Sequence, residues 1–324
     1  MKSWFRHPFA RAMAALALVL LLGFIFNADG AFFKWGTHSD MYRAISVYGI
    51  LACGMTMVII IGGIDLGVGS ILGLSAVLFS LLAIRQGWPP WMAIPATLMA
   101  GAVCGLAAGG LIARFRVQPF IATLAMMVFA RGLAKWISGG QKISTVIQKA
   151  NGDFMNVPVP AVFDQLGAKI LHGNLAVVTV IFLISIMVCW IILTKLRWGR
   201  FMYAIGGNEE AARLSGIPVW AMKLLAYGLS GLFCAVAGIC QAAQELQGDP
   251  EAGVSYELTA IAIVVIGGTS LAGGRGGIGL TLLGALTIGY LEKILSINAV
   301  GEAARLMLTG VIIVGAVLFQ RMRK

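Results

Sequence analysis

Residues 43–84 read RAISVYGILACGMTMVIIIGGIDLGVGSILGLSAVLFSLLAI, and this stretch decides the fold class. It holds two apolar runs, 43–62 and 64–84, which meet at Gly62-Gly63-Ile64-Asp65. A membrane-spanning helix needs about 20 mostly apolar residues, and each run has this length. The stretch therefore predicts two consecutive transmembrane helices.

The same pattern continues along the chain. Further apolar segments lie at 11–27, 90–113, 118–138, 174–194, 220–243, 257–271, 278–295 and 303–320. The first is interpreted as a membrane helix, because no small-x-small cleavage site of a signal peptide follows it. Only 11% of the 324 residues are charged, whereas soluble domains carry roughly a quarter. We therefore expect an all-α integral membrane protein with about ten transmembrane helices, forming a single transmembrane domain over 1–324.

Charge orients these helices. The chain has a net charge of +11. If the N-terminus is cytoplasmic, an even number of helices places most Lys and Arg residues inside, with only Asp65, Glu209 and Glu210 as acidic neighbours. This is the positive-inside pattern. It predicts that both termini are cytoplasmic, and it accounts for the basic charge without a nucleic-acid partner.

Motifs for catalysis or cofactor binding are missing from the sequence. It contains no GxxxxGK[ST] phosphate loop, no HExxH and no GxSxG. The five cysteines lie in apolar stretches without metal-binding spacing, so we expect them to be buried packing residues. The glycine-rich stretch 272–277 is expected to form a tight turn between helices. We expect no catalytic residues, no metal and no cofactor.

A second informative stretch is residues 206–218, GGNEEAARLSGIP, in an inner loop. Asn208 can cap a short helix, with Glu209 and Glu210 in the first turn, where the helix dipole favours anions. Gly216 ends the helix. A helix of two turns is marginal alone and needs a supporting surface. Two interpretations remain open: a solvated loop helix, or a lever that inserts into a cytoplasmic partner.

Asp65 is the acidic residue that lies deepest between apolar segments in the first half of the chain. An ionisable group inside a membrane is costly and is by default a functional candidate. Asp65 can equally cap a helix that starts at Leu66, which requires no functional role. The surrounding glycines suit a broken helix that lines a membrane pathway. The candidate pathway residues are Gly62, Gly63, Asp65, Gly69 and Ser70.

Four segments together resemble ribose-type bacterial ABC sugar permeases of the branched-chain amino acid and sugar permease superfamily. Residues 62–70 are similar to the signature GGIDLSVGS, with Gly67 in place of Ser. Residues 117–124 resemble V-P-x-F-I-x-T-L. Residues 203–217 resemble YAIGGNxxAAxLSGI, and residues 256–274 resemble YELxAIAAVVIGGTSLxGG. The segments follow the family's order over nearly the whole chain.

This resemblance implies a multi-pass, type II ABC importer-like permease in the bacterial inner membrane, which moves a small sugar by alternating access. It implies a separate ATP-binding cassette ATPase subunit, so that the chain itself is no enzyme. A periplasmic sugar-binding protein, an identical or different second permease subunit, and membrane lipid are the other implied partners. The region that contacts the ATPase corresponds to Asn208, Glu209, Glu210, Ala211, Ala212, Arg213, Leu214, Ser215, Gly216 and Ile217.

The main alternative is an ion-gradient-driven secondary transporter of a small polar solute. Such a transporter predicts buried acidic or His residues that bind H⁺ or Na⁺. Asp65 is the main candidate for this role in the chain. A passive channel would require repeated polar rings along a pore, and the sequence shows no such pattern.

Overall fold

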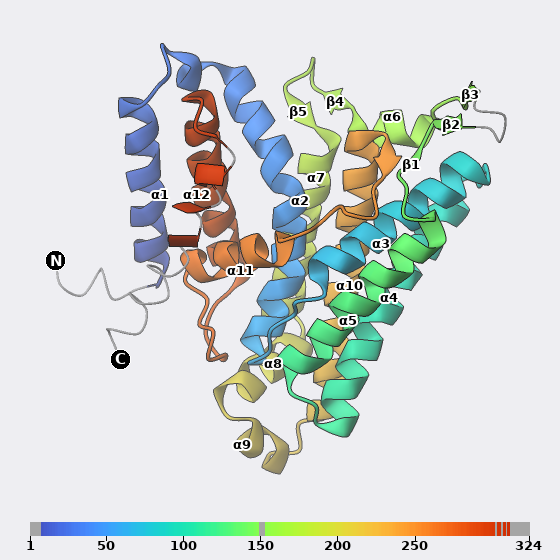
Figure 1. Cartoon of the computed structure of the whole chain (residues 1–324). Helices are drawn as coiled ribbons and strands as arrows, with labels where there is room; N and C mark the ends of the chain where they lie inside the picture. Colours follow the sequence, from blue (N-terminus) through green and yellow to red (C-terminus); the bar gives the residue numbers. More distant parts are fainter. Residues whose placement is uncertain (1–7, 149–152, 302, 306, 309, 312–324) are drawn as a thin grey trace. The chain divides into compact units, whose positions relative to one another are not determined.

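The computed structural model describes residues 8–148, 153–301, 303–305, 307–308 and 310–311. Helices make up most of the described part of the chain (Figure 1). Each of the first nine expected apolar segments coincides with a helix, which confirms the expected all-α membrane class. The tenth expected segment, 303–320, lies largely outside the described residues.

Within the described ranges, 8 helices are long and apolar enough to cross a membrane. They are α1 (Pro8–Ile25), α2 (Trp35–Ile60), α3 (Val68–Ser80) with its π-helical continuation η3 (Leu81–Arg85), α4 (Pro90–Phe115), α5 (Pro119–Ser138), α7 (Val177–Thr194), α10 (Val219–Glu245) and α12 (Ile278–Ile297). The eighth expected segment forms the shorter apolar helix α11 (Tyr256–Gly267). A total of ten membrane helices with both termini in the cytoplasm remains a prediction.

The connections between these helices contain short elements. They are η2 (Ala31–Phe33), β1 (Ile143–Ser144), β2 (Val146–Gln148), β3 (Phe154–Asn156), α6 (Ala161–Gly167), β4 (Lys169–Ile170), β5 (Leu175–Ala176), α8 (Arg197–Gly207), α9 (Glu209–Leu214) and β6 (Gln247–Gly248). Strand β1 pairs antiparallel with β6, and β2 with β3. Sequence analysis did not predict α8, because glycines and arginines interrupt the apolar pattern of its buried residues. The expected turn at 272–277 is confirmed as part of the connection between α11 and α12.

The chain divides into two compact units. Unit 1 comprises Met1–Gly62, Leu171–Ile217 and Leu258–Lys324. Unit 2 comprises Gly63–Ile170 and Pro218–Glu257. The two glycines that join the second and third apolar segments therefore fall on either side of a boundary between units.

Helix α2 forms the centre of unit 1. It packs against α7 and α12, and α1 packs on α12. Small polar side chains lie between these helices: Thr56 Oγ1 is 2.6 Å from Thr281 Oγ1, and Ser46 donates to Thr179 Oγ1 at 3.2 Å. Such residues are common partners between membrane helices. The core of unit 1 thus combines apolar packing with hydrogen bonds between hydroxyl groups.

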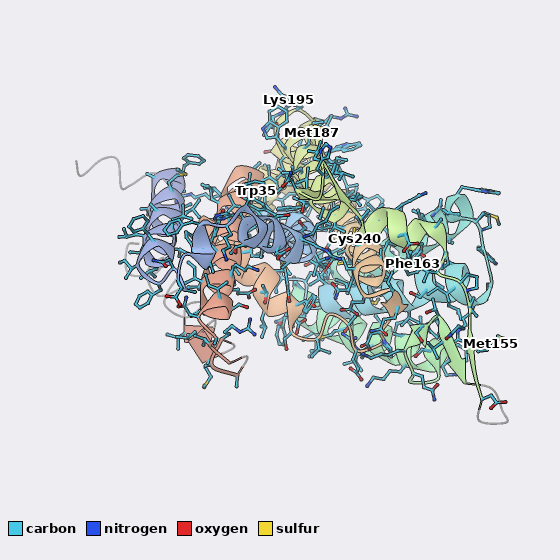
Figure 2. The ribbon with its side chains drawn as sticks, turned by 90° about the horizontal axis from the view of Figure 1, so that it is seen from above. Trp35, Met155, Phe163, Met187, Lys195 and Cys240 are labelled. Carbon is cyan, nitrogen blue, oxygen red and sulfur yellow. The ribbon has the colours of Figure 1, made fainter. Side chains whose placement is uncertain are left out.

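Helix α10 forms the centre of unit 2, with α3 and α4 packed against it. The backbones of α4 and α10 approach closely, because a Cβ atom at Gly231 would lie only 2.9 Å from the amide nitrogen of Gly105. Phe163 of α6 stacks on Phe79 of α3 with 4.9 Å between ring centroids. Figure 2 shows Phe163 beside Cys240 of α10, where α6 contacts that helix. All five cysteines are buried and free, which confirms their predicted packing role.

Candidate functional site

The segment 208–217, which the sequence marks as the candidate ATPase contact, contains a short capped helix in unit 1. Helix α9 covers Glu209–Leu214. The side-chain oxygen of Asn208 accepts a hydrogen bond from the Ala211 amide at 3.0 Å, which confirms the predicted N-cap. Two glutamates occupy the first turn, where the positive end of the helix dipole favours them.

The carboxyl end of α9 is closed as the sequence predicts. Gly216 adopts a left-handed backbone conformation with φ of +81°. The Ile217 amide donates to the carbonyl of Ala212 at 3.1 Å, a bond typical of a glycine-terminated helix. Arg213 Nη2 contacts both carboxylate oxygens of Glu210 at 2.7 Å. The hydrogen bonds to Glu210 raise the pKa of Arg213.

Helix α9 presents most of its side chains to the outside. Leu214 is 80% exposed, and Ala211, Arg213 and Ser215 are also exposed. Ala212 is buried, and α9 packs against the preceding helix α8. One face of α9 is therefore held by its packing on α8, while the opposite face exposes apolar and charged side chains. Exposure is expected both for a solvated loop helix and for a lever that inserts into a partner, so the role of α9 stays a prediction.

Helix α8 fixes α9 to the ends of two other elements of unit 1. The hydroxyl of Tyr203 donates to the carbonyl of Gly276 at 3.0 Å. At Gly206, the backbone lies directly against the carbonyl of Ile60 and the amide of Gly274. Those two groups are themselves joined, because the Gly274 amide donates to the Ile60 carbonyl at 2.9 Å. The carboxyl end of α2, the α11–α12 connection and α8 thus meet at one junction (Figure 1).

The start of α1 lies at the α11–α12 connection as well. A Cβ atom at Gly268 would be 3.6 Å from the Cβ and carbonyl oxygen of Pro8. The start of α1 therefore contacts the same α11–α12 connection that takes part in the junction with α8 and the end of α2. The location of the N-terminus and the inner loop on one side of the membrane stays a prediction.

The five candidate pathway residues fall in both units. Gly62 belongs to unit 1 and ends α2 in a left-handed conformation with φ of +83°. The other four belong to unit 2, where Gly63, Asp65, Gly69 and Ser70 are all buried. In unit 2, therefore, the sequence prediction selects interior positions at and before the start of α3.

Asp65 is 2% exposed, but it does not cap a helix at Leu66. Helix α3 begins at Val68, and the Asp65 carboxylate instead accepts hydrogen bonds from the Gly67 amide at 2.9 Å and from the Ser230 hydroxyl at 2.8 Å. The predicted N-cap is therefore wrong, because the chain makes a turn before the helix starts.

Ser70 lines a cavity of about 450 Å³ in unit 2. The lining residues come from α3, α5 and the segment before and at the start of α11, and they are Ser70, Met127, Val128, Arg131, Gly132, Lys135, Val254, Ser255 and Glu257. This groups one predicted pathway residue with charged residues that the sequence analysis did not select.

Two basic residues of α5 shape one wall of this cavity. Arg131 donates through Nη1 to the carbonyls of Pro250 and Ala252, the latter at 2.8 Å. Lys135 forms an ion pair of 2.6 Å with Glu251. The sequence analysis did not select Arg131 or Lys135 as site residues. Their spacing of four residues on one helix face is the signal that could have pointed to a shared site.

In the described ranges, no group of three or more His, Cys, Asp or Glu side chains is placed to hold a metal ion. Charged and apolar side chains together line the cavity of unit 2, and α9 is an exposed helix of unit 1.

Comparison with known proteins identifies relatives over nearly the whole chain. The ribose import permease protein of Escherichia coli (strain K12) is 39% identical over 306 residues, covering 94% of this chain and 91% of the relative. The fructose import permease protein of Rhizobium meliloti is 34% identical over 316 residues, covering 97% and 86%. The xylose transport system permease protein of Escherichia coli (strain K12) is 31% identical over 352 residues, covering 94% and 90%. No solved structure gives a significant match.

The profile of a permease family matches residues 39–317, which include both the 62–70 signature and the α9 segment. The family is described as the branched-chain amino acid transport system / permease component. Together with the apolar helices, this match identifies a multi-pass protein of the bacterial inner membrane. The chain belongs to the family of branched-chain amino acid transport system permease components.

Proposed function

We propose that this chain is the permease subunit of an ATP-binding cassette importer for a monosaccharide, with residues 1–324 forming one transmembrane permease domain. A periplasmic binding protein delivers the sugar, and a separate ATPase subunit supplies the energy. The chain carries no catalytic residues of its own. Ribose, fructose and xylose, the sugars in the names of its relatives, are the first substrates to test.

The observation that carries this proposal is the presentation of α9. A capped helix with an exposed Leu214 projects from α8, and α8 is attached to the carboxyl end of α2 and to the α11–α12 connection. Movement of an ATPase subunit bound to α9 would therefore be transmitted to the membrane helices. We assign the contact to residues 208–217, and ATP binding would favour one of two alternating-access states through this contact.

The remaining partners are a second permease subunit and lipid. Large apolar side chains face outward on the spanning helices: Phe24, Trp91 and Met99 are 64%, 74% and 67% exposed. In a membrane protein such side chains contact lipid or another transmembrane subunit. The second permease subunit, identical or different, would cover part of this apolar surface.

Co-purification followed by reconstitution tests the proposal. The tagged chain is expressed with its neighbouring reading frames, extracted in mild detergent and placed in vesicles with its associated proteins. We expect a stoichiometric subunit with a GxxxxGK[ST] loop, and sugar uptake that requires ATP and persists when ionophores remove ion gradients. Uptake that needs no ATP and stops with an ionophore would instead support the secondary transporter, with Asp65 as its ion site.

A further inference from the structure

The cavity in unit 2 has the size of a small-molecule site. Its volume of about 450 Å³ lies within the range of roughly 300–1,000 Å³ that is usual for such sites. It is bounded by the start of α3, one face of α5 and the residues at the start of α11. All of these belong to unit 2, so the cavity is a feature of one compact body.

Resting on the proposed function, we propose that this cavity binds the monosaccharide during translocation, with Glu257, Arg131 and Ser70 contacting its hydroxyl groups. A monosaccharide is neutral, and each of its hydroxyls both donates and accepts hydrogen bonds. The cavity supplies an acceptor in Glu257, donors in Arg131 and Lys135, and a hydroxyl that can do either in Ser70.

The charges around the cavity favour a neutral ligand. Lys135 is paired with Glu251 at 2.6 Å, and Arg131 and Glu257 line the same cavity. The positive and negative charges therefore balance locally. A net anion or cation would gain little here, whereas a neutral polyol can bond to both signs of charge.

Arg131 keeps donors for a ligand. Its two bonds to the carbonyls of Pro250 and Ala252 both use Nη1. A guanidinium group has five N–H donors, so Nη2 and Nε remain for other acceptors. The same side chain thus holds the 250–252 segment and lines the cavity.

The carboxylate of Glu257 is held beside the start of α3. The backbone of Gly253 lies directly against Gly69, and neither position has room for a side chain. Glu257 Oε2 lies 2.8 Å from the place where a Cβ atom of Gly69 would sit. This close approach brings Glu257 next to Ser70, which lines the same cavity. Met127, Val128 and Val254 complete the lining with apolar surface suited to the C–H face of a sugar ring.

The first test is transport by vesicles that contain the whole importer. We expect Glu257→Gln and Ser70→Ala to lower sugar uptake, the former by about tenfold, because the amide replaces a charged acceptor with a weaker neutral one and the alanine removes a hydroxyl group. Glu245→Gln is the matched control: this exposed carboxylate accepts from Gln241 at the end of α10 and does not line the cavity. Uptake unchanged in both cavity variants would overturn the proposal.

The second test does not depend on the ATPase. Gly132 lines the cavity with open space where a Cβ would be added, so Gly132→Cys places a thiol in the site, while the native cysteines are buried. We expect millimolar ribose, fructose or xylose to slow modification of this thiol by a small methanethiosulfonate reagent. Trp136→Cys, on the same helix but outside the lining, should react at an unchanged rate.

The outcomes separate the two proposals. Protection by a sugar without ATP-driven uptake would refute the importer function and leave the binding site standing. ATP-driven uptake without protection by the transported sugar would refute the site. Protection by leucine in place of sugars would overturn the assigned ligand class, because an amino acid zwitterion can also bridge Arg131 and Glu257.

Discussion

Asp65 lies in the interior of unit 2 as a carboxylate with two hydrogen-bond donors, Ser230 and the Gly67 amide. A buried polar group without such partners would be strongly unfavourable. The two bonds give Asp65 a structural role that joins the turn before α3 to α10. Its local sequence reveals the turn, but Ser230 is 165 residues away and nothing near Asp65 predicts that contact.

Replacing Asp65 by Asn separates this structural role from ion coupling. We expect Asp65→Asn to keep ATP-driven sugar uptake, because the amide oxygen can still accept from the Gly67 amide. The free energy of unfolding should fall by about 1–2 kcal/mol through the weaker bond from Ser230, measured by thermal denaturation in detergent. Asp164→Asn on the exposed side of α6 is the control. Complete loss of uptake in a well-folded Asp65→Asn protein would contradict this role.

Helix α9 was predictable as an element because its signals are local. Asn208, two glutamates and Gly216 occur within nine residues and specify a start and an end. The contacts that hold α8, from which α9 extends, were not predictable. Tyr203 and Gly276 are 73 residues apart, and their hydrogen bond exists only because α8 packs against the α11–α12 connection.

Reversing the charge of the first turn of α9 tests its role as the ATPase contact. We expect Glu209→Arg together with Glu210→Arg to leave the protein inserted, but to abolish stimulation of ATP hydrolysis by the sugar-loaded binding protein, together with uptake. The change places two cations at the positive end of the helix and removes the Glu210–Arg213 pair. ATPase assays and uptake in vesicles measure the effect. Asp164→Arg should be silent, and normal uptake in the double variant would refute the assignment.

The contact between α4 and α10 predicts a large steric effect. A side chain at Gly231 would collide with the backbone of α4, so Gly231→Leu should lower stability by about 1–3 kcal/mol. Gly110 lies on α4 with no atom within 4 Å of an added Cβ, so Gly110→Leu serves as the matched control. The thermal midpoint in detergent reports both. Equal midpoints for the two variants would show that the close approach is not needed.

At the scale of the whole molecule, hydropathy predicts the order of the described apolar helices, because a lipid bilayer accepts few structures other than helices. It does not predict where helices end. Helix α2 begins at Trp35, eight residues before the expected apolar segment, and includes the polar residues His38 and Asp40. Aromatic packing of His38 against Phe32 and Tyr290 extends the helix beyond the apolar region, and such tertiary contacts are not visible in composition.

Sidedness follows from the distribution of charge and can be tested by labelling. We expect Lys195→Cys to react with a membrane-impermeant maleimide only when the cytoplasmic side is exposed, and Gln141→Cys only from the outside. The native cysteines are buried, so background labelling should be low. Intact cells and inside-out vesicles provide the two conditions. Labelling of both positions from the same side would contradict the predicted topology.

The junction at Gly206 has a mechanical consequence. Three backbone segments touch there with no side chain between them. No flexible group can therefore deform and absorb the displacement when one segment moves. A displacement of α9 would therefore move the end of α2 by nearly the same distance. Adding even one methyl group at Gly206 would force the three segments apart. Movement of α9 would then be transmitted less completely to α2.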